Sequence, residues 1–77
     1  MSPEQLDQQL SQEPFIPLRL HLTDGTKVEI NNPALAVISR LALYVFRVDR
    51  PNSHLAQDYH LIALRHIVQV EPVAEAH

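Results

Sequence analysis

The sequence predicts a mainly β protein, in which a short N-terminal helix over residues 1–13 precedes a small five-stranded barrel over residues 17–72. Three observations lead to this prediction. Apolar and polar residues alternate over 18–30, a strand-sized apolar run covers 41–48, and prolines or an Asp-Gly pair lie where the segments end. We expect one domain, with a frayed tail over residues 73–77.

The first segment carries the signals that start a helix. Ser2 can cap it, a proline suits the first helical position, and Gln5 lies at capping-box spacing from Ser2. Leu6 and Leu10 are one turn apart and share a face. We therefore expect the helix to dock on the rest of the protein through these two leucines.

A β-hairpin over residues 18–30 is the clearest element of the sequence. A three-residue loop over 23–25 would pair Leu20 with Val28 and keep one face apolar, whereas a two-residue Asp-Gly loop would place charged side chains on that face. The longer loop also puts Gly25, the only glycine of the chain, at a left-handed bulge position. We therefore predict the three-residue loop.

The strand over residues 41–48 is apolar on both faces. Leu43 and Val45 lie on one face, and Tyr44 and Phe46 lie on the other. A strand of this kind needs cover on its second face, which the leading helix or a second subunit would supply.

The remaining segments complete the predicted barrel. Residues 34–38 are short and apolar, and we expect a helical turn or an irregular link that fills one end of the barrel. Strands are predicted over 59–64 and 67–70, with Arg65-His66 between them. This order of helix, hairpin, strand, hairpin and short final strand is typical of a five-stranded SH3-like or Sm-like barrel.

Composition limits the classes of function. The chain has no cysteine, so it forms no disulfide and offers no thiolate to a metal or a substrate. Its formal net charge of −3 excludes a globally basic nucleic-acid binder, although a local basic patch remains open. The first residues lack the features of a signal peptide, and no apolar run is long enough to span a bilayer. We therefore expect a soluble cytoplasmic protein without a membrane partner.

Several segments together resemble a family of small uncharacterised bacterial proteins. These are Pro14-Phe15-Ile16-Pro17, the Leu22-Thr23-Asp24-Gly25 turn, Asn32-Pro33, Tyr59-His60-Leu61-Ile62 and His66-Ile67-Val68 before Pro72. Members of that family have an N-terminal helix, a PFxP segment and an LxDG hairpin. The resemblance covers nearly the whole chain and implies a fold without implying an activity.

A further likeness is to the bacterial Sm-like RNA chaperone. Arg65-His66-Ile67, followed by Val70-Glu71-Pro72, is similar to the basic turn before the last strand of that family. The likeness implies that Arg65 and His66 face RNA at a subunit boundary. The sequence departs from that family in its second strand, because residues 26–30 contain no glycine at which the strand could bend.

Candidate chemistry is sparse. His54, Asp58 and His60 have the spacing H-x3-D-x-H, which could hold zinc but is also that of a polar strand edge with two solvated histidines. His21 and His66 are either pH-sensitive contacts or ordinary surface histidines. No nucleophile elbow or phosphate-binding glycine loop is present. We therefore assign no catalytic residue, no metal ligand and no cofactor.

The function predicted from the sequence is a non-enzymatic protein-interaction or self-assembly module that forms a homo-oligomer or docks on an unknown protein partner. Its expected interface residues are Leu6, Leu10, Tyr44 and Phe46. The alternative is an Sm-like RNA-binding ring, in which Tyr44 and Phe46 stack on bases and the basic contacts come from Arg47, Arg50, Arg65 and His66. A metal-dependent enzyme is a third and more distant hypothesis.

Overall fold

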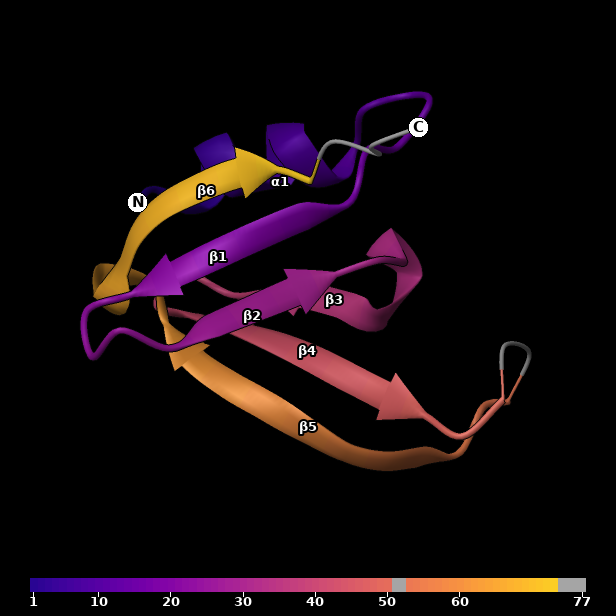
Figure 1. The fold of residues 1–77 in the computed structure, drawn as a ribbon. Coiled ribbons are helices and arrows are strands. Elements are labelled where there is room, and N and C mark those ends of the chain that lie inside the picture. The colour runs from indigo at the N-terminus through magenta and orange to yellow at the C-terminus, as the bar shows by residue number, and fades with distance from the viewer. Residues whose placement is uncertain (51–52, 74–77) are drawn as a thin grey trace.

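Two three-stranded antiparallel sheets and a short helix form the part of the chain that the computed structural model describes, residues 1–50 and 53–73 (Figure 1). The elements in chain order are α1 (Pro3–Leu10), β1 (Leu18–Leu22), β2 (Lys27–Ile30), the 3-10 turn η1 (Pro33–Leu35), β3 (Ala36–Ile38), β4 (Ala42–Val48), β5 (Ala56–Ala63), η2 (Leu64–His66) and β6 (Ile67–Pro72). The strand orders are β2-β1-β6 and β3-β4-β5.

The prediction of a five-stranded SH3-like or Sm-like barrel is therefore wrong. The described residues form six strands in two separate sheets that do not close into a barrel. The reason lies at Asn32-Pro33, because proline cannot donate a ladder hydrogen bond. The pairing of β2 with β1 stops at Ile30. The turn η1 then redirects the chain, which continues as β3 and pairs with β4. The expected helical turn over 34–38 is thus correct only for its first residues, and a strand follows.

The hairpin is as predicted. Leu18 pairs with Ile30 and Leu20 pairs with Val28, which is the register of the three-residue loop. Gly25 has a φ of 88°, in the left-handed region that favours glycine. The Asp24 carboxylate accepts hydrogen bonds from Oγ1 and N of Thr26 at 2.6 and 3.0 Å, and these bonds lower the pKa of Asp24.

The helix begins with the predicted capping box between Ser2 and Gln5. It ends at Leu10, three residues before the predicted end at residue 13. Leu6 is completely buried and Leu10 is partly buried. The docking role of the two leucines is thus confirmed.

The core lies between the two sheets. The first sheet contributes Leu18, Leu20, Ile30 and Ile67, the last of these from β6. The second sheet contributes Leu43, Val45 and Ile62. Leu6 from α1 and Leu64 from η2 complete the core. Leu6 packs with residues on the inner face of β4 and β5. Leu6 therefore does not cover the outer face of β4. From the sequence, either the leading helix or a second subunit could cover that face, and the helix does not do so through Leu6.

The last strands are longer than predicted, and their order is correct. β5 starts three residues before Tyr59, η2 holds Arg65 and His66, and β6 includes Pro72. Of the tail, only Val73 is described, where its amide donates to the carbonyl of Pro17 at 2.8 Å. The expected fraying of the final residues lies outside the described part.

The hairpin geometry makes a prediction for Gly25. A Cβ at this position would meet no atom within 4 Å, so the cost of a side chain there comes from the backbone conformation alone. Gly25→Val should reduce the free energy of unfolding by about 1–2 kcal/mol, whereas Gly25→Asn should cost much less, because asparagine tolerates the left-handed region. Urea unfolding followed by circular dichroism measures both. Equal stabilities would contradict the role assigned to Gly25.

Candidate functional site

The outer face of the β3-β4-β5 sheet is the most distinctive surface of the molecule. Directly opposed residues project to the same side of a sheet, so the register places one apolar set together, away from the core. We call this set the aromatic face: Val37, Ala42, Tyr44, Phe46, Tyr59, Leu61 and Ala63. It contains no charged side chain.

Three rings form the centre of the aromatic face. The ring centroids of Tyr44 and Phe46 are 6.3 Å apart, those of Tyr44 and Tyr59 are 6.1 Å apart, and those of Phe46 and Tyr59 are 5.9 Å apart. These separations lie within the range of favourable aromatic pairs. Tyr59 is nevertheless 57% exposed, so the cluster stabilises the sheet without being removed from water.

The strands expose this face because their other side fills the core. Along β4, Leu43 and Val45 are buried, and the residues between them point outward. In β5, residues 56–61 are all exposed and Ile62 is the first buried residue. Among the described residues, β5 pairs only with β4, so its second edge is open. Figure 1 shows the β4–β5 hairpin extending away from the first sheet.

The structure places the four interface residues expected from the sequence in two different environments. Tyr44 and Phe46 lie half-buried on the aromatic face. Leu6 is fully buried within its own core, and Leu10 packs against that core. Only the two aromatic residues are thus placed where a second molecule could contact them.

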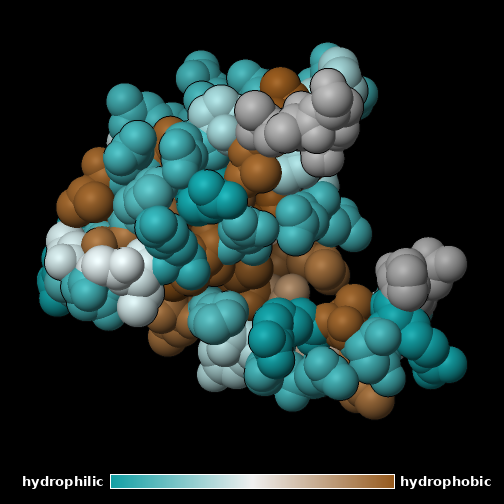
Figure 2. Space-filling model, in the orientation of Figure 1, coloured by the Kyte–Doolittle hydropathy of each residue, from teal (hydrophilic) through white to brown (hydrophobic). Residues whose placement is uncertain are grey.

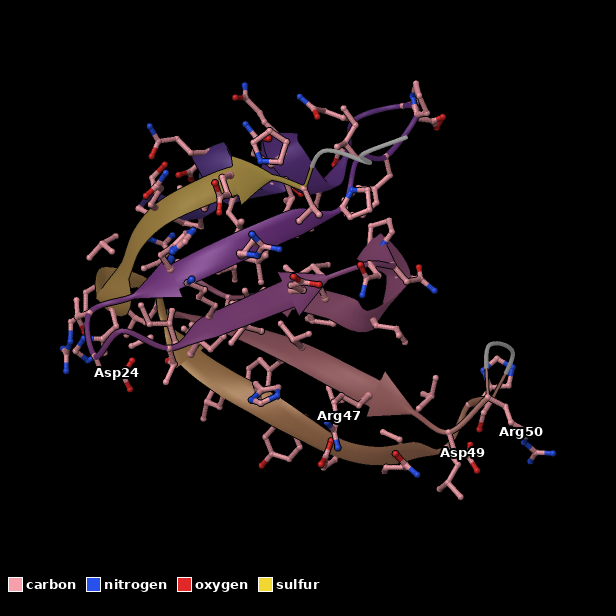
Figure 3. The ribbon with its side chains drawn as sticks, in the orientation of Figure 1. Asp24, Arg47, Asp49 and Arg50 are labelled. Carbon is pink, nitrogen blue, oxygen red and sulfur yellow. The ribbon has the colours of Figure 1, made fainter. Side chains whose placement is uncertain are left out.

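The residues expected to bind RNA do not come together. Arg47 lies on the side of β4 opposite Tyr44 and Phe46, and its guanidinium donates to the Asp58 carboxylate at 2.7 and 3.0 Å (Figure 3). Arg50 lies near the tip of the hairpin, 3.9 Å from Asp49. Arg65 and His66 lie in η2. Arg65 lines a pocket with Arg40, Tyr44 and Leu61 at one end of the aromatic face, whereas His66 lines a different pocket. The four expected residues therefore do not form one cluster, and of them only Arg65, with Arg40 beside it, adjoins the aromatic face.

The three residues with zinc-like spacing are also not assembled into a site. Asp58 is engaged by Arg47, and His60 lies opposite Val45 on the side of β5 that bears Asp58. Across residues 1–50 and 53–73, no group of three histidine, aspartate or glutamate side chains is arranged to hold a metal ion.

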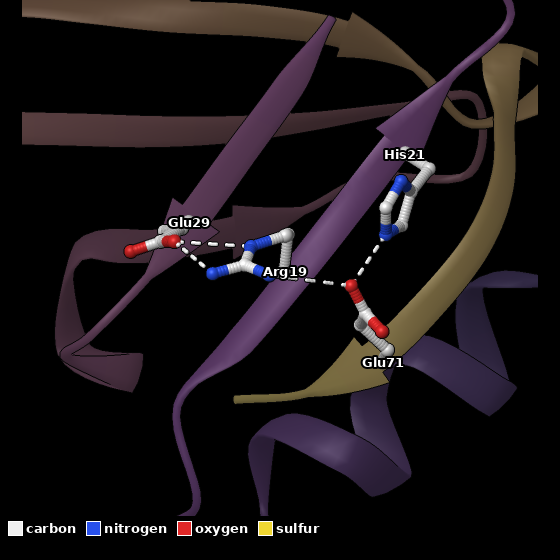
Figure 4. Close-up of polar contacts among 4 residues, drawn as sticks. All are labelled: Arg19, His21, Glu29 and Glu71. Atoms are coloured by element: carbon white, nitrogen blue, oxygen red, sulfur yellow. Dashed lines mark hydrogen bonds and ion pairs between the residues drawn. The ribbon is translucent and has the colours of Figure 1, made fainter. Parts of the chain in front are cut away.

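The outer face of the other sheet has a different character. Arg19 donates two hydrogen bonds to one oxygen of Glu29, at 2.9 and 3.1 Å, and lies 3.5 Å from Glu71. Nε2 of His21 lies 2.7 Å from the same Glu71 oxygen (Figure 4). The hydrogen bond with His21, and then the charge of Arg19, lower the pKa of Glu71. Polar side chains cover β1 and β2 in Figure 2, so this face is suited to water.

Sequence reasoning missed Tyr59 and Leu61 as parts of the candidate site, and it missed the polar network around Arg19. The alternation of Tyr59, Leu61 and Ala63 was a usable signal, because it marks one face of a strand. Assigning that face to the outside required knowing which side of β4 meets the core, and this depends on tertiary packing.

Comparison with protein-family models, with curated proteins and with solved structures finds no match for this chain. Within the described residues, no helix has the length and the apolar character needed to cross a membrane. The fold and the aromatic face are therefore the observations on which a function can be proposed.

The network around Glu71 predicts a pH dependence. Because the folded-state pKa of Glu71 is lowered from its ordinary 4.5, its contribution to stability is present above that value and is lost as the pH falls through the folded pKa. Glu71→Gln should therefore destabilise the protein at neutral pH, and the difference from wild type should shrink toward about pH 3. Urea unfolding of both proteins at the two pH values measures this difference in the free energy of unfolding.

His21→Ala provides the control for this prediction. In that background, Glu71→Gln should change the stability less, because the principal hydrogen bond to Glu71 is already absent. A difference between wild type and Glu71→Gln that stays constant with pH would contradict the role of the Glu71 charge.

Proposed function

We propose that this protein is a non-enzymatic self-association module, and that a second copy of the chain covers part of the aromatic face along β5. The observation that supports the proposal is the partly exposed cluster of Tyr44, Phe46 and Tyr59 beside a strand edge that has no partner among the described residues. Contiguous apolar patches and open edges are both features through which protein chains associate.

The fold itself leaves apolar side chains of the aromatic face in contact with water. Tyr59 and Leu61, both on the edge strand β5, are each 57% exposed. Burial of apolar surface is worth roughly 25 cal/mol per Å², so a small domain gains considerably if such side chains are covered. Aromatic residues are also enriched in the buried centres of protein interfaces.

The chemistry of the face favours a second copy over a nucleic acid. The aromatic face itself carries no charged residue, and Arg47 is on the opposite side of β4 in an ion pair with Asp58. Arg40 and Arg65 lie at one end of the face, away from the Phe46–Tyr59 pair. Binding of a phosphate backbone depends on free basic side chains, and the chain as a whole has a formal net charge of −3. A two-fold symmetric contact along β5 sets the apolar residues of β5 beside the same residues of the second copy and brings no unpaired charge to the aromatic face.

The proposal predicts the effect of a charge on the face. Sedimentation equilibrium of the wild-type protein should show a dimer, and Tyr59→Glu should weaken dimerisation by at least about tenfold, because each copy then brings a carboxylate to the apolar contact. Val68→Glu is the matched control, because Val68 is 63% exposed on β6 in the other sheet. This variant should dimerise like wild type.

Two outcomes would contradict the proposal. One is a wild-type protein that stays monomeric at high concentration. The other is a monomeric wild type that binds a single-stranded RNA and loses this binding in Tyr59→Glu, which would assign the aromatic face to base stacking instead.

A further inference from the structure

We infer that two copies associate by antiparallel pairing of β5 with β5 of the partner, with Tyr59 on the two-fold axis. This inference rests on the proposed self-association and adds the strand and the register. It follows from the four edge strands that the two sheets have among the described residues, from the pattern of charges along β5, and from the position of the rings.

The four edges differ in how well they resist pairing. β2 has only four residues and carries Lys27 and Glu29, β3 has only three residues, and β6 contains Pro72. Short length, charges and proline are the features by which natural proteins protect edge strands. β5 has eight residues, no proline, no lysine and one acidic residue, Asp58. It is therefore the least protected edge.

The sequence of β5 is complementary to itself in one register. Asp58 and His60 lie on the same side of the strand, one residue before and one residue after Tyr59. If Tyr59 pairs with Tyr59 of the partner subunit, each Asp58 lies opposite the other copy's imidazole, and the two contacts are related by symmetry. Among the described residues, the His60 side chain has no hydrogen bond or ion pair, so its ring can donate to Asp58 of the second copy. That carboxylate already accepts two hydrogen bonds from Arg47 of its own chain and would accept the third through a remaining lone pair.

The same register joins the two aromatic clusters. Phe46 lies directly opposite Tyr59 within one copy. Pairing at Tyr59 would then place four rings in a row across the two sheets, two from each copy. A shift of the axis to Leu61 would instead put both Asp58 carboxylates far from any imidazole of the partner. The charges and the rings thus favour the same centre.

The absence of cysteine from the chain allows a direct test by disulfide formation between single-cysteine variants. In the inferred register, the two Cα atoms at position 59 are about 4.5–5.5 Å apart, a separation that suits a disulfide. Tyr59→Cys should therefore cross-link rapidly under mild oxidation. Leu61→Cys is the matched control, because Leu61 lies on the same face and has the same 57% exposure. Its two copies would be about 13 Å apart and should not cross-link.

A pair of charge variants tests the register without altering the rings. His60→Asp places two carboxylates opposite each other, and Asp58→Lys places a lysine opposite His60 of the partner subunit, so each variant alone should dimerise about tenfold more weakly than wild type. Mixed together, they should form a heterodimer, because Asp58 then faces an imidazole and the new aspartate faces the new lysine. Both sites are exposed, but Asp58→Lys also removes the ion pair with Arg47 and sets two cations opposite each other within one copy. Circular dichroism must therefore show that each variant keeps the wild-type fold before its dimerisation is compared.

The outcomes separate the register from the proposed function. A wild-type dimer in which Leu61→Cys cross-links in preference to Tyr59→Cys, or in which the mixed charge variants fail to associate, would overturn the register and leave self-association in place. A wild-type monomer would overturn both.

Discussion

The break in strand pairing at Asn32-Pro33 is the constraint on which the rest of the structure depends. Because proline lacks the amide hydrogen that a ladder needs, the strand that pairs with β1 cannot continue into the strand that pairs with β4. The chain is divided into two sheets that meet only through their inner faces. The second sheet is completed on one side by the very short β3, and β5 is left as its other edge. An open edge and an uncovered outer face are therefore direct consequences of this local break.

The distribution of apolar side chains adds a second constraint. A chain of 77 residues can fill one small core, and the inner faces of both sheets, with Leu6 from α1, already fill it. The apolar residues on the outer face of β4 and β5 are then additional to what the fold buries. A sheet face that stays in water usually carries mainly polar side chains, as is seen on the face that carries Arg19, Glu29 and Glu71.

The sequence predicted those features that are determined locally. The capping box of Ser2 and the loop at Gly25 depend on residues a few positions apart, and the alternation over 18–30 fixes the hairpin register by itself. The sheet to which residues 36–38 belong depends on a pairing with β4, which no local pattern specifies. For the same reason, Tyr44 and Phe46 could be identified as one face of a strand, while the contribution of Tyr59 from the next strand could not. To predict whether that face points toward the core or toward solvent, one would need to know where the helix packs.

The two outer faces together explain why association would use one side of the molecule only. On the first sheet, Glu71 shares its oxygen between Arg19 and His21, so covering that face would remove a satisfied charged network from water and gain little. On the second sheet, an uncharged cluster of rings adjoins an edge whose backbone groups have no strand partner among the described residues. A contact along β5 would satisfy those backbone groups and shield Tyr59 at the same time. Because antiparallel pairing of β5 with β5 of a second copy would use the open edge of both chains, association along β5 would end at two copies and would favour a closed pair over an open-ended chain.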